Sequence, residues 1–110
     1  EGRRSVLLVS LARDAQWEQV LRALAGAGAD RLIVTGGPQD RAVPPDAIAE
    51  QWRTCSSVAA EVVDSTEAAF RRAVQAAGPH GVVAVTGSPQ LAGYCRPLAK
   101  TFPAQALVQP

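Results

Sequence analysis

The stretch Gly81-Val82-Val83-Ala84-Val85-Thr86-Gly87-Ser88-Pro89 decides the fold of this 110-residue chain. Its β-branched apolar run predicts a buried strand, and Ser88 followed by Pro89 predicts the N-cap and first turn of a helix. A strand that ends in Thr-Gly-Ser and leads directly into a helix places a hydroxyl and free backbone N–H groups where an anion can dock. The stretch therefore predicts a strand-to-helix unit and a ligand-binding position.

Outward from this stretch, the same strand-then-helix unit recurs along the chain. Apolar runs predict strands over 5–9, 32–34, 59–63 and 82–85, with one more short strand over 106–108. Helical periodicity predicts helices over 14–25, from Pro45 to about residue 52, from about residue 64 to 77, and over 88–100. Strands that alternate with helices predict an α/β fold of Rossmann-like kind, an open and mainly parallel sheet with helices on both faces.

Polar residues follow the predicted strands where each one ends. These positions are Ser10 to Asp14, Thr35-Gly36-Gly37, Asp64-Ser65-Thr66 and Thr86-Gly87-Ser88. Because ligands of open parallel sheets bind at the carboxyl ends of the strands, we expect the functional site at this edge.

Composition sets limits on the class of protein. The 11 basic and 10 acidic residues are spread along the chain, which argues against nucleic-acid or membrane partners. No apolar run approaches the roughly 20 residues of a membrane span. The cysteines, Cys55 and Cys95, suggest ordinary thiols of a cytoplasmic protein, and a single histidine argues against a zinc site or a Ser-His-Asp triad.

Each candidate residue at the expected edge also has a purely structural interpretation. Ser88 binds a carboxylate or phosphate, or it only caps a helix. The Gly36-Gly37 stretch with Asp40 and Arg41 wraps a phosphate, or it is a plain loop without the G-x-G-x-x-G spacing. Asp14 orients a ligand, or it is the N-cap of the first helix.

Other conspicuous residues have simpler interpretations. Arg41 and Arg96 each meet an anion or only keep the domain soluble. We expect His80 in a solvent-facing turn at the opposite edge of the sheet, and we expect Trp17 and Trp52 to pack in the core. We predict that Asp64, with Glu67 three residues on, caps the third helix.

The order of these pieces resembles the C-terminal domain of the Mur ligase superfamily, and within it folylpolyglutamate synthase and dihydrofolate synthase. Four stretches carry the resemblance: Ala12-Arg13-Asp14, Thr35 with Arg41-Ala42, Asp64 through Ala73, and Thr86-Gly87-Ser88 with Gly93 and Arg96. The resemblance covers residues 5 to 98 and is most specific in the last of these stretches.

The resemblance implies one domain, residues 1–110, of an ATP-dependent amide ligase. In such enzymes a central ATPase domain of the same polypeptide binds ATP and Mg²⁺ and activates an acid, and the C-terminal domain closes over the site where an amino acid attacks. It implies a glutamate substrate, a folate-type acceptor, a cytoplasmic role in one-carbon metabolism, and no activity of the domain alone. The substrate-binding residues that the resemblance implies are Ser88, Gly87, Asp14 and Arg41. It implies no catalytic or metal-binding residue in this chain.

Departures from the family pattern keep other functions open. Ala15-Gln16 stand where the family has Lys-Asp, and the family's Asp-Gly-Ala-His-Asn segment and Walker A loop are absent from the sequence. We expect the chain, which begins at Glu1 and contains no Met, to be a piece of a larger protein. The alternatives are a non-catalytic binding or assembly domain, the same domain of a cell-wall Mur ligase, or a Rossmann-like domain that uses the Gly36-Gly37 loop.

Overall fold

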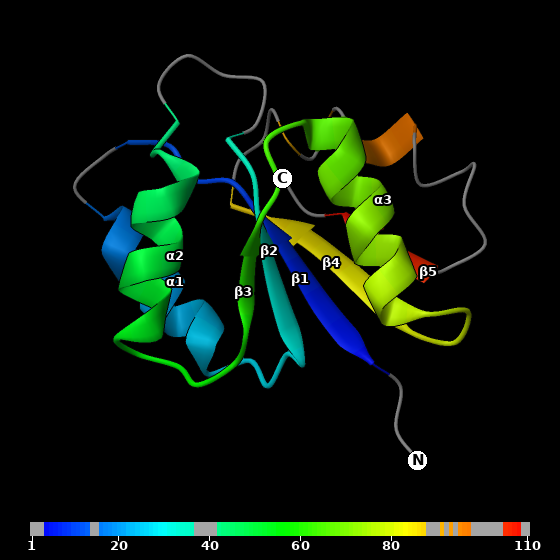
Figure 1. Ribbon diagram of the computed structural model, residues 1–110, viewed down its shortest axis with the longest axis horizontal. Coiled ribbons are helices and arrows are strands. Elements are labelled where there is room, and N and C mark those ends of the chain that lie inside the picture. The colour runs from blue at the N-terminus through cyan, green and yellow to red at the C-terminus, as the bar shows by residue number, and fades with distance from the viewer. Residues whose placement is uncertain are drawn as a thin grey trace.

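Five parallel strands form the sheet at the centre of the molecule, in the order β3-β2-β1-β4-β5 (Figure 1). The computed structural model describes residues 4–13, 16–36, 42–87, 91, 93, 95–97 and 105–108. The strands are β1 (Ser5–Val9), β2 (Arg31–Val34), β3 (Ala60–Val62), β4 (Val82–Thr86) and β5 (Gln105–Val108). The predicted open parallel sheet is confirmed, including the short strand near the end of the chain.

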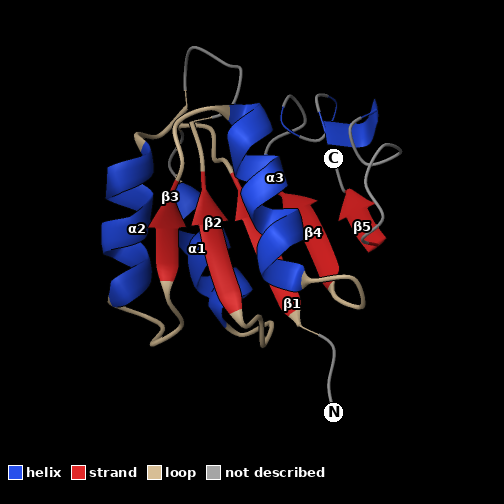
Figure 2. Ribbon diagram, turned by 45° about the vertical axis from the view of Figure 1, so that its right-hand side comes forward, coloured by secondary structure: helices blue, strands red, loops and turns tan. Residues whose placement is uncertain are grey.

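Helices cover both faces of this sheet (Figure 2). The helices are α1 (Trp17–Ala25), α2 (Pro45–Arg53) and α3 (Thr66–Ala77). α1 and α2 pack on one face and α3 packs on the other. The described residues from 91 to 97 are also helical, within the predicted last helix, and Leu91 and Cys95 join the core on the α3 face. The predicted Rossmann-like fold is confirmed.

The strand sequences explain why both faces are buried. Side chains of successive residues in a strand point to opposite faces, so a near-continuous apolar run fills two cores. On β1, Val6 and Leu8 face α3, whereas Leu7 and Val9 face α1 and α2. All four side chains are buried.

The first helix begins later than the sequence predicts. α1 starts at Trp17 with Gln16 at the N-cap position, so the prediction of Asp14 as N-cap is wrong. Trp17 packs against the core as expected, and Val20 is 41% exposed. Leu21 is the residue that α1 buries completely, because a straight helix turns only a narrow stripe toward the sheet.

The third helix is capped by a different residue from the one predicted. Ser65 is the N-cap of α3, and its hydroxyl accepts a hydrogen bond of 3.2 Å from the backbone N–H of Ala68. The prediction of Asp64 as the cap is therefore wrong by one residue. Ser65 has the extended backbone that an N-cap requires, with φ −86° and ψ 136°.

The second helix forms as its sequence predicts. Pro45 is its first residue, where a missing N–H costs nothing, and Ile48, Ala49 and Trp52 are buried. The indole N–H of Trp52 donates a 2.9 Å hydrogen bond to the carbonyl of Val58, which satisfies its one polar group. Trp52 is therefore a core residue, as predicted.

Edge strand β3 is held to α3 by charged side chains. Arg72 donates to both carboxylate oxygens of Glu61, at 3.1 and 2.9 Å, and Arg31 lies 3.7 Å from the same carboxylate. Partly exposed ion pairs of this kind stabilise by at most about 1 kcal/mol each, so they fix the edge strand more than they drive folding.

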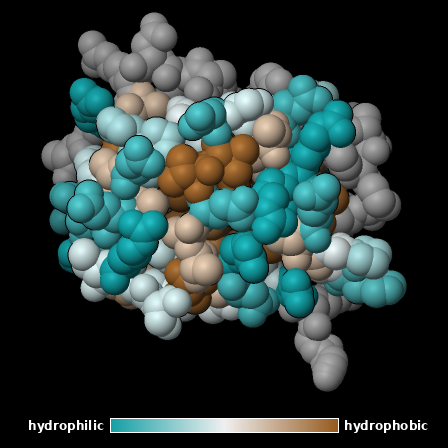
Figure 3. Space-filling model, viewed as in Figure 1, coloured by the Kyte–Doolittle hydropathy of each residue, from teal (hydrophilic) through white to brown (hydrophobic). Residues whose placement is uncertain are grey.

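On the face of the molecule that carries α3, hydrophilic surface surrounds a small apolar area between α2 and α3 (Figure 3).

A candidate substrate-binding edge of the sheet

The carboxyl ends of β1, β2, β3 and β4 meet along one edge of the sheet, because all four strands run parallel. The strand order places a topological switch point between β1 and β4, since the chain moves outward from β1 to β3 and then crosses to β4. Ligands of open α/β sheets bind outside the strand ends at such a point. The residues that follow β1 and β4 are therefore the first place to look for a site.

Two buried hydroxyl groups bridge neighbouring strand ends at this edge. Ser10 follows β1 and donates to the carbonyl of Gly36 at 3.1 Å, and Thr35 follows β2 and donates to the carbonyl of Asp64 at 3.3 Å. Both Ser10 and Thr35 are completely buried. Each hydroxyl thus ties its own strand end to the loop that follows the next strand.

Backbone contacts join the loops after β1 and β2 further out. The N–H of Val43 donates to the carbonyl of Leu11 at 2.8 Å, and Ala12 and Ala42 form an antiparallel bridge. Together with the Ser10 hydrogen bond, these contacts join Gly36, Ala42 and Val43 to residues 10–12. The described residues that follow β1 and β2 are therefore connected.

Gly87 brings the end of β4 into the same unit. Its φ of +101° lies in a region that residues with side chains rarely adopt. A Cβ at this position would lie 2.5 Å from the carbonyl oxygen of Ser10 and 2.8 Å from a methyl carbon of Leu11. Only glycine therefore allows the backbone after β4 to pack directly on the backbone after β1.

The structure places the predicted site residues as follows. Gly87 lies at the expected edge, whereas Asp14, Arg41 and Ser88 lie outside the described residues, as do Gly37 and Asp40. Gly93 and Arg96 are both helical and exposed. Which side chains would contact a ligand thus stays a prediction.

The sequence places Ser10 at this edge but indicates no role for it. The structure shows that it contacts both neighbouring strand ends, through its hydroxyl toward β2 and through its carbonyl toward Gly87. The available signal was a small polar residue directly after the apolar run 6–9, because a buried hydroxyl there needs a hydrogen-bond partner.

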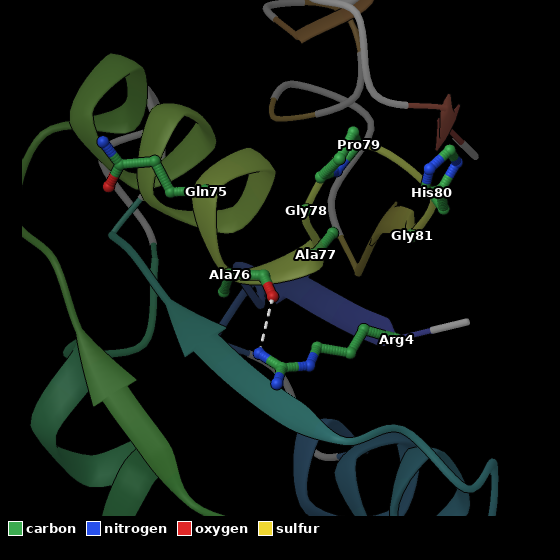
Figure 4. Close-up of a pocket in the computed structure, with 8 residues that line it drawn as sticks. All are labelled: Arg4, Gln75, Ala76, Ala77, Gly78, Pro79, His80 and Gly81. Carbon is green, nitrogen blue, oxygen red and sulfur yellow. Dashed lines mark hydrogen bonds between the residues drawn. The ribbon is translucent and has the colours of Figure 1, made fainter. Parts of the chain in front are cut away.

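Two cavities among the described residues lie at the opposite, amino-terminal edge of the sheet. One, of about 250 Å³, is lined by Arg4 and by residues 75–81 at the end of α3, and the other, of about 280 Å³, also includes Arg4. Figure 4 shows the Arg4 guanidinium directed toward the carbonyl of Ala76, to which it donates at 3.4 Å, while His80 lies on the other side of the turn. His80 is exposed, as predicted. The Arg4 and His80 side chains therefore point away from each other in the first cavity, and the second is lined by Arg4, Asp30 and Arg31 with Val6 and Ala76.

The Cys95 thiol is buried in the hydrophobic core. Burial raises the pKa of the Cys95 thiol from 9.0 to about 11, and this side chain lies in the core on the α3 face. Within the described ranges, no group of three or more His, Cys, Asp and Glu residues is arranged to hold a metal ion. No helix in that part of the chain is long and apolar enough to cross a membrane.

The fold is that of a Rossmann-like α/β domain, and its candidate ligand edge lies at the carboxyl ends of β1 and β4. The family model described as "Mur ligase, glutamate ligase domain" matches residues 1–89 of the chain. The chain belongs to this family, and the resemblance found in the sequence is confirmed. No curated protein matches the chain in sequence.

A solved structure supports the same assignment. The chain is similar to Mycobacterium tuberculosis folylpolyglutamate synthase, solved with ADP and AMPPCP, with 26% sequence identity and a TM-score of 0.74. The match covers 89% of this chain and 24% of the synthase. The chain thus spans about a quarter of the length of the enzyme that it resembles.

Proposed function

We propose that this chain is the C-terminal, substrate-closing domain of an ATP-dependent amide ligase that adds glutamate to a folate-type acceptor. The observation that carries the proposal is the family match over residues 1–89, which includes the whole Thr86-Gly87-Ser88 segment at the strand ends. The similarity to a folylpolyglutamate synthase favours glutamate and a folate over other substrates. The domain is inactive alone and acts in the cytoplasm, in one-carbon metabolism.

In this proposal the domain binds substrate and excludes water, and it does not carry out the chemical step. Closure of such a domain sequesters the reacting groups and completes the site. Gly87 and Ser88 present backbone N–H groups and a hydroxyl to the incoming amino acid, and Asp14 and Arg41 contact charged substrate groups from the neighbouring loops. The contacts that join Ser10 to Gly36 and Gly87, and Ala12 to Ala42, support the proposal because these described residues flank the predicted substrate-binding positions in the sequence.

ATP and Mg²⁺ belong in this proposal to the central ATPase domain of the same polypeptide. In the described part of this edge, the hydroxyls of Ser10 and Thr35 already donate to carbonyls. Mg²⁺ in such enzymes is bound by one or two carboxylates together with substrate phosphates. Nucleotide supplies the phosphoryl group that activates the acceptor acid, and the residues of this chain orient the amino acid.

The test is ADP release by the full-length protein with a pteroate or folate acceptor and L-glutamate. We expect turnover that depends on glutamate and that falls by about two orders of magnitude in Ser88→Ala, since displaced substrate contacts cost that much. Ser57→Ala, an exposed serine in the loop before β3, is the matched control and should leave turnover unchanged. Wild-type protein that releases no ADP with any folate acceptor would contradict the proposal.

The departure at Ala15-Gln16 favours a second candidate, a binding or assembly domain that has lost the ligase role. In the structure Gln16 occupies the N-cap position of α1, in the segment where the resembling enzymes have Lys-Asp. The same assay separates the two candidates, because glutamate-dependent closure and turnover exclude a purely non-catalytic role. Turnover with a cell-wall precursor in place of folate would instead assign the chain to another Mur-type ligase.

A further inference from the structure

We propose that Ser10 is a positioning residue, which sets the spacing of the substrate-binding loops and thereby the affinity of the enzyme for its amino-acid substrate. The proposal rests on the proposed function, because the loops that Ser10 joins lead into the predicted substrate-binding residues. Ser10 makes no contact with substrate in this proposal. It acts through Gly87 and through the loop after β2.

The first argument is the place of Ser10 in the sheet. It follows the central strand β1, which pairs with both β2 and β4, so its neighbours on the two sides are the ends of those strands. The side chain is completely buried, and its hydroxyl donates to Gly36 at 3.1 Å across 26 residues of sequence. This buried side-chain hydrogen bond adds to the backbone contacts, Val43 to Leu11 and Ala12 to Ala42, that join the same two loops.

The second argument is that Gly87 packs on the backbone of Ser10. A Cβ on Gly87 would lie 2.5 Å from the Ser10 carbonyl oxygen, so this contact leaves no free space between the two peptides. Any shift of the Ser10 peptide therefore shifts Gly87, the predicted substrate-binding residue that the structure describes. Ser10 thus contacts the residues that follow both neighbouring strands, β2 and β4.

The neighbouring hydroxyl provides a matched comparison. Thr35 is equally buried and donates to the carbonyl of Asp64 at 3.3 Å, so it joins the end of β2 to the end of β3. It does not reach β4, whose Gly87 packs on Ser10. Loss of the Thr35 hydroxyl should weaken the fold as much as loss of the Ser10 hydroxyl, without moving Gly87.

The experiment compares Ser10→Ala with Thr35→Val in the full-length protein, using ADP release at varied L-glutamate. We expect the KM for glutamate to rise about fivefold in Ser10→Ala, the equivalent of one lost hydrogen bond, with kcat within about twofold. Thr35→Val should show a similar fall in Tm and the wild-type KM. Ser10→Cys, which keeps a weak donor of similar size, should lie between Ser10→Ala and wild type and replaces it if Ser10→Ala does not fold.

An unchanged glutamate KM in Ser10→Ala, or an equal rise in Thr35→Val, would overturn the positioning role while leaving the proposed function intact. If wild-type protein shows no glutamate-dependent turnover, the proposed function fails, and hydrogen exchange of the Val43 amide decides the inference. That amide donates to Leu11 across the joined loops. Faster exchange in Ser10→Ala but not in Thr35→Val supports the inference, and equal exchange in both contradicts it.

Discussion

The two edges of the sheet differ in how their loops are held. At the carboxyl edge, the ends of β1, β2 and β4 are joined by the Ser10 hydroxyl, by the Ala12–Ala42 bridge and by the close approach of Gly87. At the amino edge, two cavities of about 250 and 280 Å³ open around Arg4, whose guanidinium donates to the last turn of α3. The edge that we propose for substrate binding is thus the one whose strand ends are joined, and the two cavities lie at the other edge.

Two glycines at the amino edge, in the segments before β2 and β4, give the largest expected effect on stability. A Cβ on Gly81, at the amino edge, would overlap the Ala77 carbonyl and lie 2.6 Å from its carbon, so Gly81→Ala should destabilise the protein by about 2–4 kcal/mol. Gly26→Ala, whose Cβ would have an ordinary 3.6 Å contact, should be neutral or up to about 1 kcal/mol more stable. Urea unfolding of both variants measures the difference. Equal stability of the two would contradict the close approach at Gly81.

The two ends of α3 lie at opposite edges of the sheet, so one variant at each end compares the edges within one helix. Ser65 caps the end at the carboxyl edge with a 3.2 Å hydrogen bond, and Ser65→Ala should cost about 1 kcal/mol. Arg4 donates to the other end at 3.4 Å from an exposed position, and Arg4→Gln should cost less than about 0.5 kcal/mol. Thermal unfolding of the two variants checks the order, and a larger loss in Arg4→Gln would reverse the comparison.

The smallest expected effect is a difference in reactivity between the thiols of Cys55 and Cys95, with no change in fold at neutral pH. Cys95 is buried with its pKa raised to about 11, so a thiol reagent at pH 8 should label the partly exposed Cys55 and leave Cys95 unlabelled. Folding raises the pKa of the Cys95 thiol above 9.0. The contribution of this thiol to the free energy of unfolding is therefore present below pH 9 and is lost as pH rises toward 11. Rapid labelling of Cys95 in native protein, followed by mass spectrometry, would contradict its burial.

Most of the fold was predictable because two periodicities alternate along the chain. Continuous apolar runs mark β1, β2 and β4, whose side chains face two cores, and the helical spacing of Ile48 and Trp52 marks α2. Local signals were weaker at helix starts. Asp64 and Ser65 are both good N-cap residues, and only the extended backbone of Ser65 selects it.

The sequence predicts the edge at which the candidate site is expected but not the contacts within that edge. A polar residue after each parallel strand is enough to place the edge. The Ser10–Gly36 hydrogen bond spans 26 residues, and the packing of Gly87 on Ser10 depends on the register of β1 against β4. Such contacts follow from the assembled sheet and leave no local pattern in the sequence.

The most direct test of the account compares Gly87→Ala with Gly81→Ala in the full-length protein, since both substitutions place a Cβ against backbone but at opposite edges. Glutamate-dependent ADP release is measured at a temperature where circular dichroism shows both variants folded. The account predicts that Gly87→Ala loses about tenfold to a hundredfold in kcat/KM for glutamate, whereas folded Gly81→Ala keeps the wild-type value. Equal losses in the two variants, or a loss confined to Gly81→Ala, would contradict the assignment of substrate binding to the carboxyl edge.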